Sequence, residues 1–205
     1  MISNPLSVGQ WKRTESLRSA GRKKLGVTDK DFLVMAVGQI EGRKGVDDFI
    51  DIAESLPECK FVWVGGRPFR IMTEGILRLN RKIKKAGPQI NFIGLKTLAE
   101  MPELYAAGDA FIFPSYQENC PLAPLEAAAS GMPVIYRDLK EYKSLYKNPY
   151  LKAKDNTEFI QLLKRIINDN AFRLEATSMS IKLLEQFDKN QIRKELISLY
   201  ESLVN

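Results

Sequence analysis

Two short apolar runs, residues 110–113 and 133–136, bracket a loop and a short helical stretch in the middle of the chain. Pro124 can take the first helical position, where its missing N–H is not needed, and Gly131 is placed to end the helix. Strand, loop, helix and strand in this order form one parallel βαβ unit. The loop of such a unit lies at the carboxyl end of a strand and at a helix amino terminus, which is the usual place for an anionic ligand in an open α/β sheet.

The alternation of apolar runs and helical stretches continues along most of the chain. Residues 32–37 and 60–64 are nearly continuous apolar runs, as expected of strands covered by helices on both faces. Shorter candidate strands lie at 90–93 and 150–151. We therefore predict the α/β class, with a single Rossmann-like, doubly wound parallel sheet of about six strands. Right-handed crossovers then bring three loops to one edge of that sheet, namely residues 39–45, 65–67 and 115–124.

The two ends of the chain differ from this middle part. Residues 1–30 are predicted to be a linker that enters a short basic helix, and residues 31–155 to form the sheet domain. Residues 156–205 have helical periodicity and are expected to pack as C-terminal helices on the same domain, with Asn156 or Thr157 as the first cap. The last of these helices carries an apolar stripe, which is typical of ordinary core. The stripe comprises Ile192, Leu196, Leu199, Tyr200 and Leu203.

Composition excludes several kinds of site. The 205 residues contain no histidine, which excludes a Ser-His-Asp triad and the commonest zinc sites within this chain. Cys59 and Cys120 have no metal-ligand spacing and are interpreted as reduced, partly buried thiols of a cytosolic protein. No apolar stretch reaches the ~18 residues of a membrane-spanning helix, and the start of the chain has no signal-peptide pattern. We therefore expect a cytoplasmic protein.

The chain is basic, with a net charge of +6 and a pI near 9.2. This balance suits an anionic partner: nucleotide phosphates, an anionic membrane surface or nucleic acid. The cations concentrate at residues 12–30 and 67–85. Such runs are usually solvated helix faces; the alternative is contact with anionic lipid, which would make the protein peripheral on the inner face of the membrane. No nucleic-acid partner is expected, because the runs lack interleaved aromatic side chains that stack on bases.

The loop after the first strand has the composition of a phosphate-binding loop. Gly42 and Gly45 let the backbone approach a ligand closely. Lys44 offers a point charge to a diphosphate, and Arg43 offers a two-pronged guanidinium. The loop is not a Walker loop, because the G-x-x-x-x-G-K-[ST] spacing is absent, and the absence of G-x-G-x-x-G from the chain argues against NAD.

Two carboxylates mark the central unit, Glu118 in the loop and Glu126 in the first turn of the helix. Taken singly, Glu118 suits a solvated loop acid, and Glu126 suits a charge that complements the helix dipole. As a pair beside a phosphate-binding loop they fit a sugar nucleotide, whose hydroxyl groups donate hydrogen bonds to carboxylates. Two carboxyls that flank one glycosidic bond would instead indicate a hydrolase, but a Glu in the first turn of a helix is better placed for binding.

The arrangement E-x(7)-E, with N-C-P-L after the first Glu and E-A-A-A-S-G-M-P-V-I at the second, resembles the retaining glycosyltransferases of family 4. The resemblance runs from about Val8 to Leu203 and falls on the second, donor-binding domain of their two-domain GT-B fold. Within that family, R-K-G-V-D-D-F-I, F-V-W-V-G-G, P-S-Y-Q-E-N and R-D-L-K-E-Y are similar to bacterial diacylglycerol glucosyltransferases.

The resemblance implies a role for each candidate residue. Glu118, the catalytic candidate, would contact the donor sugar near the reacting carbon, and Glu126 would hold the ribose hydroxyls. Lys44 matches a family lysine that binds the donor diphosphate. The family arginine falls at Gln39, so either Arg43 replaces it or the diphosphate relies on Lys44 alone. The other implied donor-binding positions are Gly66, Leu95 (at the base), Asn119, Cys120, Pro121 and Leu122.

The resemblance also implies an activity: transfer of a sugar, glucose from UDP-glucose, to a lipid or sugar hydroxyl with retention, with diacylglycerol in glycolipid synthesis as the expected acceptor. No metal and no cofactor are expected, since the UDP-sugar is a substrate. The family's first domain, which supplies an active-site histidine, has no counterpart in this chain, so we expect one half of a GT-B enzyme that is inactive alone. The alternative is a non-catalytic nucleotide-sugar-binding module that works with a separate acceptor-binding partner.

Overall fold

The computed structural model describes residues 4–67 and 76–204. Its centre is a six-stranded sheet with the order β3-β2-β1-β4-β5-β6, in which every neighbouring pair is parallel. The order reverses between β1 and β4, which is the switch point where open α/β sheets bind ligands. The predicted doubly wound sheet is therefore confirmed. The strands are β1 (Leu33–Val37), β2 (Lys60–Val64), β3 (Ile90–Phe92), β4 (Ala110–Phe113), β5 (Val134–Arg137) and β6 (Leu151–Ala153).

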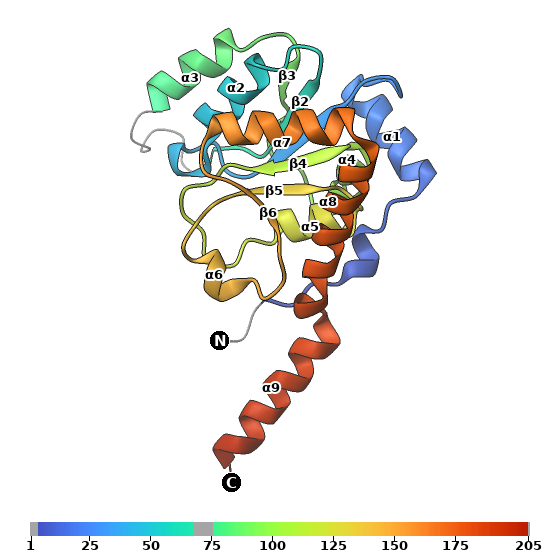
Figure 1. The fold of residues 1–205 in the computed structure, drawn as a ribbon, viewed down its shortest axis with the longest axis vertical. Helices are drawn as coiled ribbons and strands as arrows, with labels where there is room; N and C mark the ends of the chain where they lie inside the picture. Colours follow the sequence, from blue (N-terminus) through green and yellow to red (C-terminus); the bar gives the residue numbers. More distant parts are fainter. Residues whose placement is uncertain (1–3, 68–75, 205) are drawn as a thin grey trace.

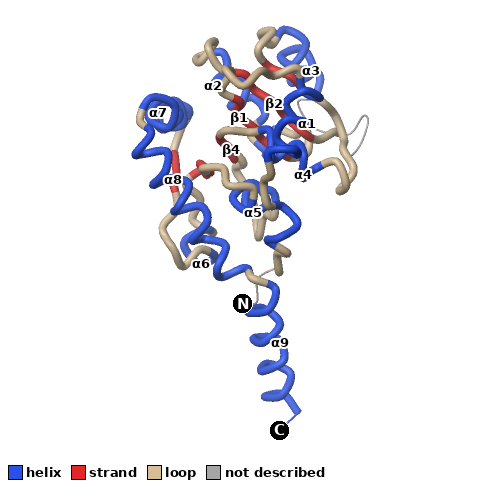
Figure 2. Tube along the Cα trace, turned by 90° about the vertical axis from the view of Figure 1, so that its right-hand side faces the viewer, coloured by secondary structure: helices blue, strands red, loops and turns tan. Residues whose placement is uncertain are grey.

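Helices cover both faces of the sheet (Figures 1 and 2). Alternate residues of each strand face opposite layers, as the pleat requires. Leu33 and Met35 of β1 belong to the layer that contains α4 and α5, while Val34 and Ala36 belong to the layer that contains α2 and α7. The helices are α1 (Glu15–Leu25), α2 (Val46–Glu54), α3 (Ile76–Lys85), α4 (Met101–Ala107), α5 (Ala123–Ala129), α6 (Tyr142–Leu145), α7 (Asn156–Asn168), α8 (Asn170–Leu183) and α9 (Lys189–Val204), with 3-10 turns η1 (Val8–Trp11), η2 (Gly42–Lys44) and η3 (Leu184–Phe187).

The basic helix near the start of the chain, α1, packs on α4, and one of its cations is not solvated. Arg22 is only 2% exposed, and its guanidinium donates to the Ala107 carbonyl at 2.9 Å and to Asp109 at 3.0 Å. The interpretation of this run as a solvated face is therefore wrong for Arg22. The physical reason is that the last carbonyls of α4 need donors, which a guanidinium supplies in a fixed fork.

The C-terminal helices correct two predictions. Asp155, and not Asn156 or Thr157, caps α7, because its carboxylate accepts from the Glu158 N–H at 3.0 Å. Ile192 of α9 is buried, but Tyr200 and Leu203 are 66% and 73% exposed, so the stripe is ordinary core only in its first part. The reason is geometric: α9 extends away from the sheet (Figure 1).

No helix among the described residues is long and apolar enough to cross a membrane.

Candidate functional site

The loops after β1 and β4 meet at the switch point of the sheet. The Tyr116 N–H donates to the Arg43 carbonyl at 2.8 Å, and the Ser115 hydroxyl donates to the same oxygen at 3.1 Å. Gly45 has φ +73°, and a Cβ there would lie 2.3 Å from the Pro114 carbonyl oxygen, so the junction requires glycine. The two loops are therefore joined through their backbones.

The loop after β2 joins the same edge. The Ile40 N–H donates to the Gly66 carbonyl at 3.0 Å. Gly65 has φ +134°, and a Cβ there would lie 2.1 Å from the Gly38 carbonyl oxygen. The predicted convergence of three loops is thus confirmed for their described parts; residues 68–75, in which part of the second basic run falls, lie outside the described residues.

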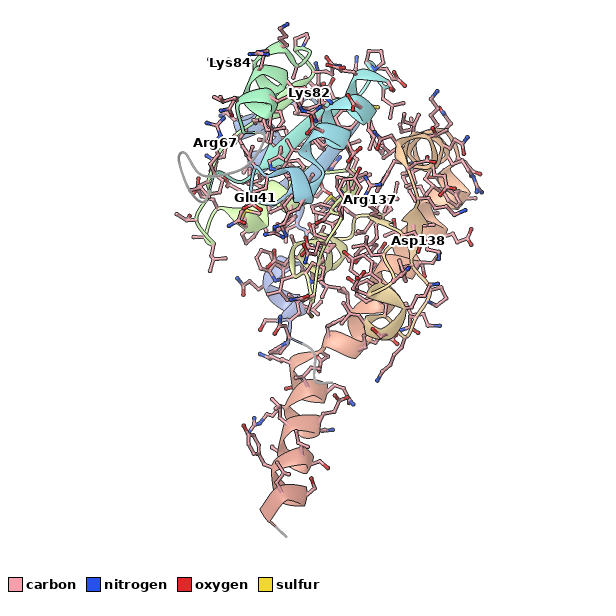
Figure 3. The ribbon with its side chains drawn as sticks, turned by 90° about the vertical axis from the view of Figure 1, so that its left-hand side faces the viewer. Glu41, Arg67, Lys82, Lys84, Arg137 and Asp138 are labelled. Carbon is pink, nitrogen blue, oxygen red and sulfur yellow. The ribbon has the colours of Figure 1, made fainter. Side chains whose placement is uncertain are left out.

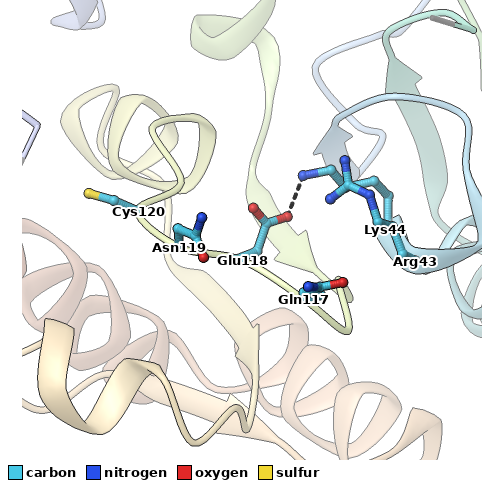
Figure 4. A pocket seen from close by; sticks show the side chains of 6 residues that line it. All are labelled: Arg43, Lys44, Gln117, Glu118, Asn119 and Cys120. Carbon is cyan, nitrogen blue, oxygen red and sulfur yellow. Dashed lines mark hydrogen bonds and ion pairs between the residues drawn. The ribbon is translucent and has the colours of Figure 1, made fainter.

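The joined loops enclose an open cavity of about 370 Å³, which Figure 4 shows from close by. At its centre the Lys44 ammonium forms an ion pair with the Glu118 carboxylate. These side chains are 15% and 9% exposed, so the pair is largely screened from water. The cavity is lined by Arg43, Lys44, Gln117, Glu118, Asn119 and Cys120.

Arg43 lines the cavity beside Lys44, whereas Gln39 does not. The Arg43 guanidinium pairs with Glu41 at 2.8 Å and lies within 3.5 Å of the Gln39 side-chain oxygen. The Arg43 side chain remains 45% exposed. Of the two candidates for the family arginine's role, Arg43 thus lines the cavity, and its guanidinium is held by Glu41 and Gln39.

Glu126 has surroundings different from those of Glu118 and does not line this cavity. Its carboxylate accepts a hydrogen bond from the Tyr105 hydroxyl at 2.8 Å. Burial raises the pKa of Glu126, and the Tyr105 hydrogen bond opposes that rise. The Tyr105 ring packs edge-on against Trp11, with ring centroids 5.5 Å apart. The sequence pattern did not predict this contact of Tyr105, although a hydroxyl on an otherwise apolar helix face was a signal for it.

The remaining candidates, Gly66, Leu95, Pro121 and Leu122, do not line this cavity. Leu95 is 76% exposed and sits against Gly66, where a Cβ would come within 2.6 Å of its side chain. Pro121 is buried and Leu122 is exposed just before α5. The helix α5 begins at Ala123, so Pro124 is the second helical residue and not the first. The missing N–H is equally harmless there, because the first four N–H groups of a helix have no intrahelical partner.

The cysteines are free, with Cys59 buried and Cys120 half-buried. Burial raises the pKa of Cys59 to about 11. In residues 4–67 and 76–204, no three His, Cys, Asp or Glu side chains gather where they could hold a metal ion.

Comparison with known proteins identifies the family of this chain. A family model described as "Glycosyl transferases group 1" matches residues 18–193. The alpha-galactosylglucosyldiacylglycerol synthase of Streptococcus pneumoniae is 31% identical over 180 residues, which cover 88% of this chain and 48% of that protein. The processive diacylglycerol alpha-glucosyltransferase of Acholeplasma laidlawii is 25% identical over 205 residues, covering 99% of this chain and 60% of that protein. The chain thus spans about half the length of the curated relatives it matches.

Among solved structures, that of Anabaena Alr3699/HepE in complex with UDP-glucose superposes with a TM-score of 0.85. It is 21% identical, and the match covers 98% of this chain and 57% of that one. At this level of sequence identity the likeness shows the fold alone, which matches that of GT-B structures.

Proposed function

The chain belongs to the glycosyl transferases group 1 family, and from this premise we propose that it is the donor-binding half of a retaining, metal-independent hexosyltransferase. The donor is a nucleotide sugar, UDP-glucose, and the acceptor is a lipid or sugar hydroxyl. The observation that carries the proposal is the cavity at the sheet's switch point, where Lys44 and Glu118 face each other beside Arg43.

In this proposal the cavity serves the diphosphate and the adjoining sugar. Breaking the bond between the sugar and the diphosphate leaves negative charge on the diphosphate, and pre-placed donors stabilise that charge. Lys44 and Arg43 supply two cations, and the backbone N–H groups of Asn119, Cys120 and Leu122 lie in the loop that leads into α5. Glu118 then accepts hydrogen bonds from sugar hydroxyls close to the reacting carbon.

In the same proposal Glu126 holds the ribose hydroxyls, and the base lies against Gly66 and Leu95. The carboxylate of Glu126 has one oxygen engaged by Tyr105, which leaves its other oxygen for a ribose hydroxyl. Support for this role is the fixed position of the carboxylate in the first turn of α5, on the same helix that the cavity loop enters.

Diacylglycerol is the proposed acceptor, because the two relatives compared above are named for products or substrates that contain it. A lipid acceptor lies in a membrane, and we propose that the protein works at the cytoplasmic face of that membrane. The helix α3 supports this location, since Arg81, Lys84 and Lys85 are exposed, whereas Arg78 pairs with Asp47 at 3.3 Å and Lys82 pairs with Asp51 at 2.6 Å (Lys82 and Lys84 are labelled in Figure 3). Flotation with anionic vesicles but not with neutral ones is the expected behaviour, and equal flotation with both would argue against it.

The experiment that tests the donor site is calorimetric titration with UDP, UDP-glucose, GDP and uridine, without added metal. Lys44→Ala should weaken UDP binding while leaving uridine binding nearly unchanged, because uridine carries no phosphate. Glu126→Ala should weaken both. Lys24→Ala is the matched control, since Lys24 also forms an ion pair with a Glu, at 2.6 Å, but belongs to α1. Equal losses for UDP and uridine in Lys44→Ala would place Lys44 away from the diphosphate.

The same titration bears on the alternative, a nucleotide-sugar-binding module without chemistry of its own. Both functions require nucleotide binding, and they differ in turnover. Sugar transfer from UDP-glucose by the natural protein together with its acceptor-binding part would establish the enzyme, whereas binding without transfer would favour the module.

A further inference from the structure

Arg137, at the end of β5, is a buried cation that the donor site does not use directly. Its side chain is labelled in Figure 3, and the residue is 5% exposed. Its Nε donates to the Pro114 carbonyl at 2.8 Å, and its Nη1 donates to the Lys154 carbonyl at 3.1 Å. Its Nη2 lies 3.1 Å from the Asp48 carboxylate. The guanidinium therefore donates two hydrogen bonds, from Nε and Nη1, and its third nitrogen, Nη2, has an ion-pair partner in Asp48.

Two of these three partners belong to the segments beside the cavity, and the third, the Lys154 carbonyl, follows β6. Pro114 opens the loop that contains Glu118, and Asp48 lies in the first turn of α2, one turn beyond Lys44. The ring of Tyr116 covers the guanidinium, with its centroid 4.1 Å from Cζ. The same Tyr116 donates its N–H to the Arg43 carbonyl. One side chain thus ties together the two loops that hold the cavity's cation and carboxylate.

The fold alone does not call for a charge at this position. The preceding residues of β5, from Val134 to Tyr136, are buried and uncharged. Well-packed apolar residues are often at least as stabilising as a buried ion pair, because taking two charges out of water is costly. What a guanidinium adds is geometry, since its planar fork fixes the directions of several acceptors at once.

We propose that Arg137 is a positioning residue, which holds the Lys44 and Glu118 loops in the register that the diphosphate and the donor sugar require. This inference rests on the proposed function for the identity of the ligand. Among the described residues no hydrogen bond or ion pair joins Arg137 to a side chain that lines the cavity, so it acts through Pro114, Asp48 and Tyr116.

The test compares Arg137→Gln with Arg22→Gln. Arg22 is also a buried arginine with an Asp partner, at 3.0 Å. It donates to the end of α4 and, within the described part of the chain, makes no hydrogen bond or ion pair with the segments that line the cavity. Loss of hydrogen bonds to a charged group predicts that Arg137→Gln weakens UDP binding about tenfold, with uridine binding changed less than about twofold. Arg22→Gln should change UDP and uridine binding by equal factors. A ratio of UDP to uridine affinity in Arg137→Gln equal to that of the wild type would overturn the proposal.

A second measurement needs no ligand. The Tyr116 amide bridges the two loops, so hydrogen exchange at this amide reports their register. The exchange rate of this amide is divided by that of the β1 amides, which serve as an internal reference. Arg137→Gln should raise this ratio at least about tenfold more than Arg22→Gln raises it. If the wild type binds no nucleotide, the proposed function fails. Exchange at the Tyr116 amide still decides whether Arg137 holds the two loops together. Protection of this amide in Arg137→Gln equal to that in the wild type would overturn that role.

Milder variants keep the test decisive if Arg137→Gln does not fold. Arg137→Lys keeps the charge, but a single ammonium cannot serve three divergent partners, so it should restore part of the UDP affinity. Asp48→Asn removes only the charged partner of Arg137. UDP binding as tight as in the wild type for both variants would contradict the proposal.

Discussion

In the free protein the Lys44 ammonium is already neutralised by Glu118, so a diphosphate must displace that carboxylate before it can use the cation. Glu118→Gln removes the competing charge and keeps the shape of the side chain. It also removes the repulsion between a carboxylate and an arriving diphosphate. We therefore expect this variant to bind UDP more tightly than the wild type does, although it removes the proposed catalytic carboxylate.

The magnitude follows from the burial of the pair, whose side chains are 15% and 9% exposed. Two unit charges about 4 Å apart interact by about 4 kcal/mol at the effective dielectric constant of a protein surface region. Desolvation offsets part of this, and hydrogen bonds to charged groups contribute about 1.5–3 kcal/mol net. Since each 1.4 kcal/mol is a factor of about ten, UDP affinity should rise between about tenfold and about a hundredfold.

Calorimetry with UDP, UDP-glucose and uridine measures this effect. Uridine affinity should stay unchanged, and UDP-glucose should gain less than UDP, because its sugar loses the Glu118 contact. Glu103→Gln is the control, since it removes the same charge from another Lys–Glu pair, with Lys24 at 2.6 Å, away from the cavity. UDP affinity that is unchanged or lower in Glu118→Gln would refute the idea that Lys44 must be released to bind the diphosphate.

Two further predictions concern buried polar groups. Burial raises the pKa of Glu126 above 4.5, so the folded state favours the protonated carboxyl, and its contribution to stability falls as the pH rises from 4.5 through the raised pKa. Glu126→Gln should thus increase the free energy of urea unfolding at pH 7 and change it less near pH 4.5; a loss at pH 7 would contradict this. The Tyr142 hydroxyl is buried without a hydrogen-bond partner among the described residues, so Tyr142→Phe should leave stability unchanged or raise it by up to about 1 kcal/mol. A clear loss in the same urea titration would mean that this hydroxyl has a partner.

The sheet could be predicted because its signals are local. A strand covered on both faces must be apolar throughout, and Phe61 to Val64 satisfy that rule within four residues. Once the strands are parallel, right-handed crossovers bring their carboxyl ends to one edge, so the meeting of the Lys44 and Glu118 loops followed from topology. The paired carboxylates could be selected by their positions in a loop and in the first turn of a helix.

The contacts made by individual polar side chains could not be predicted in this way. Lys44 and Glu118 are 74 positions apart, and Arg22 and Asp109 are 87 apart. No local pattern encodes which cation meets which carboxylate over such separations. The exposure of Leu203 does not follow from the pattern for a similar reason, since helical periodicity shows that a stripe exists but not whether another surface covers it.

The two carboxylates of the E-x(7)-E unit differ in what a ligand must do to reach them. Glu126 is fixed before any ligand arrives, through Tyr105, which packs in turn against Trp11. Glu118 is held by Lys44, the residue that the ligand itself needs. If the proposed donor site is correct, the ribose end is pre-organised and the diphosphate end is not, so most of the reorganisation on binding falls on one ion pair. The diphosphate then releases Glu118 for the sugar in the same step that engages Lys44, which makes sugar recognition depend on an intact diphosphate.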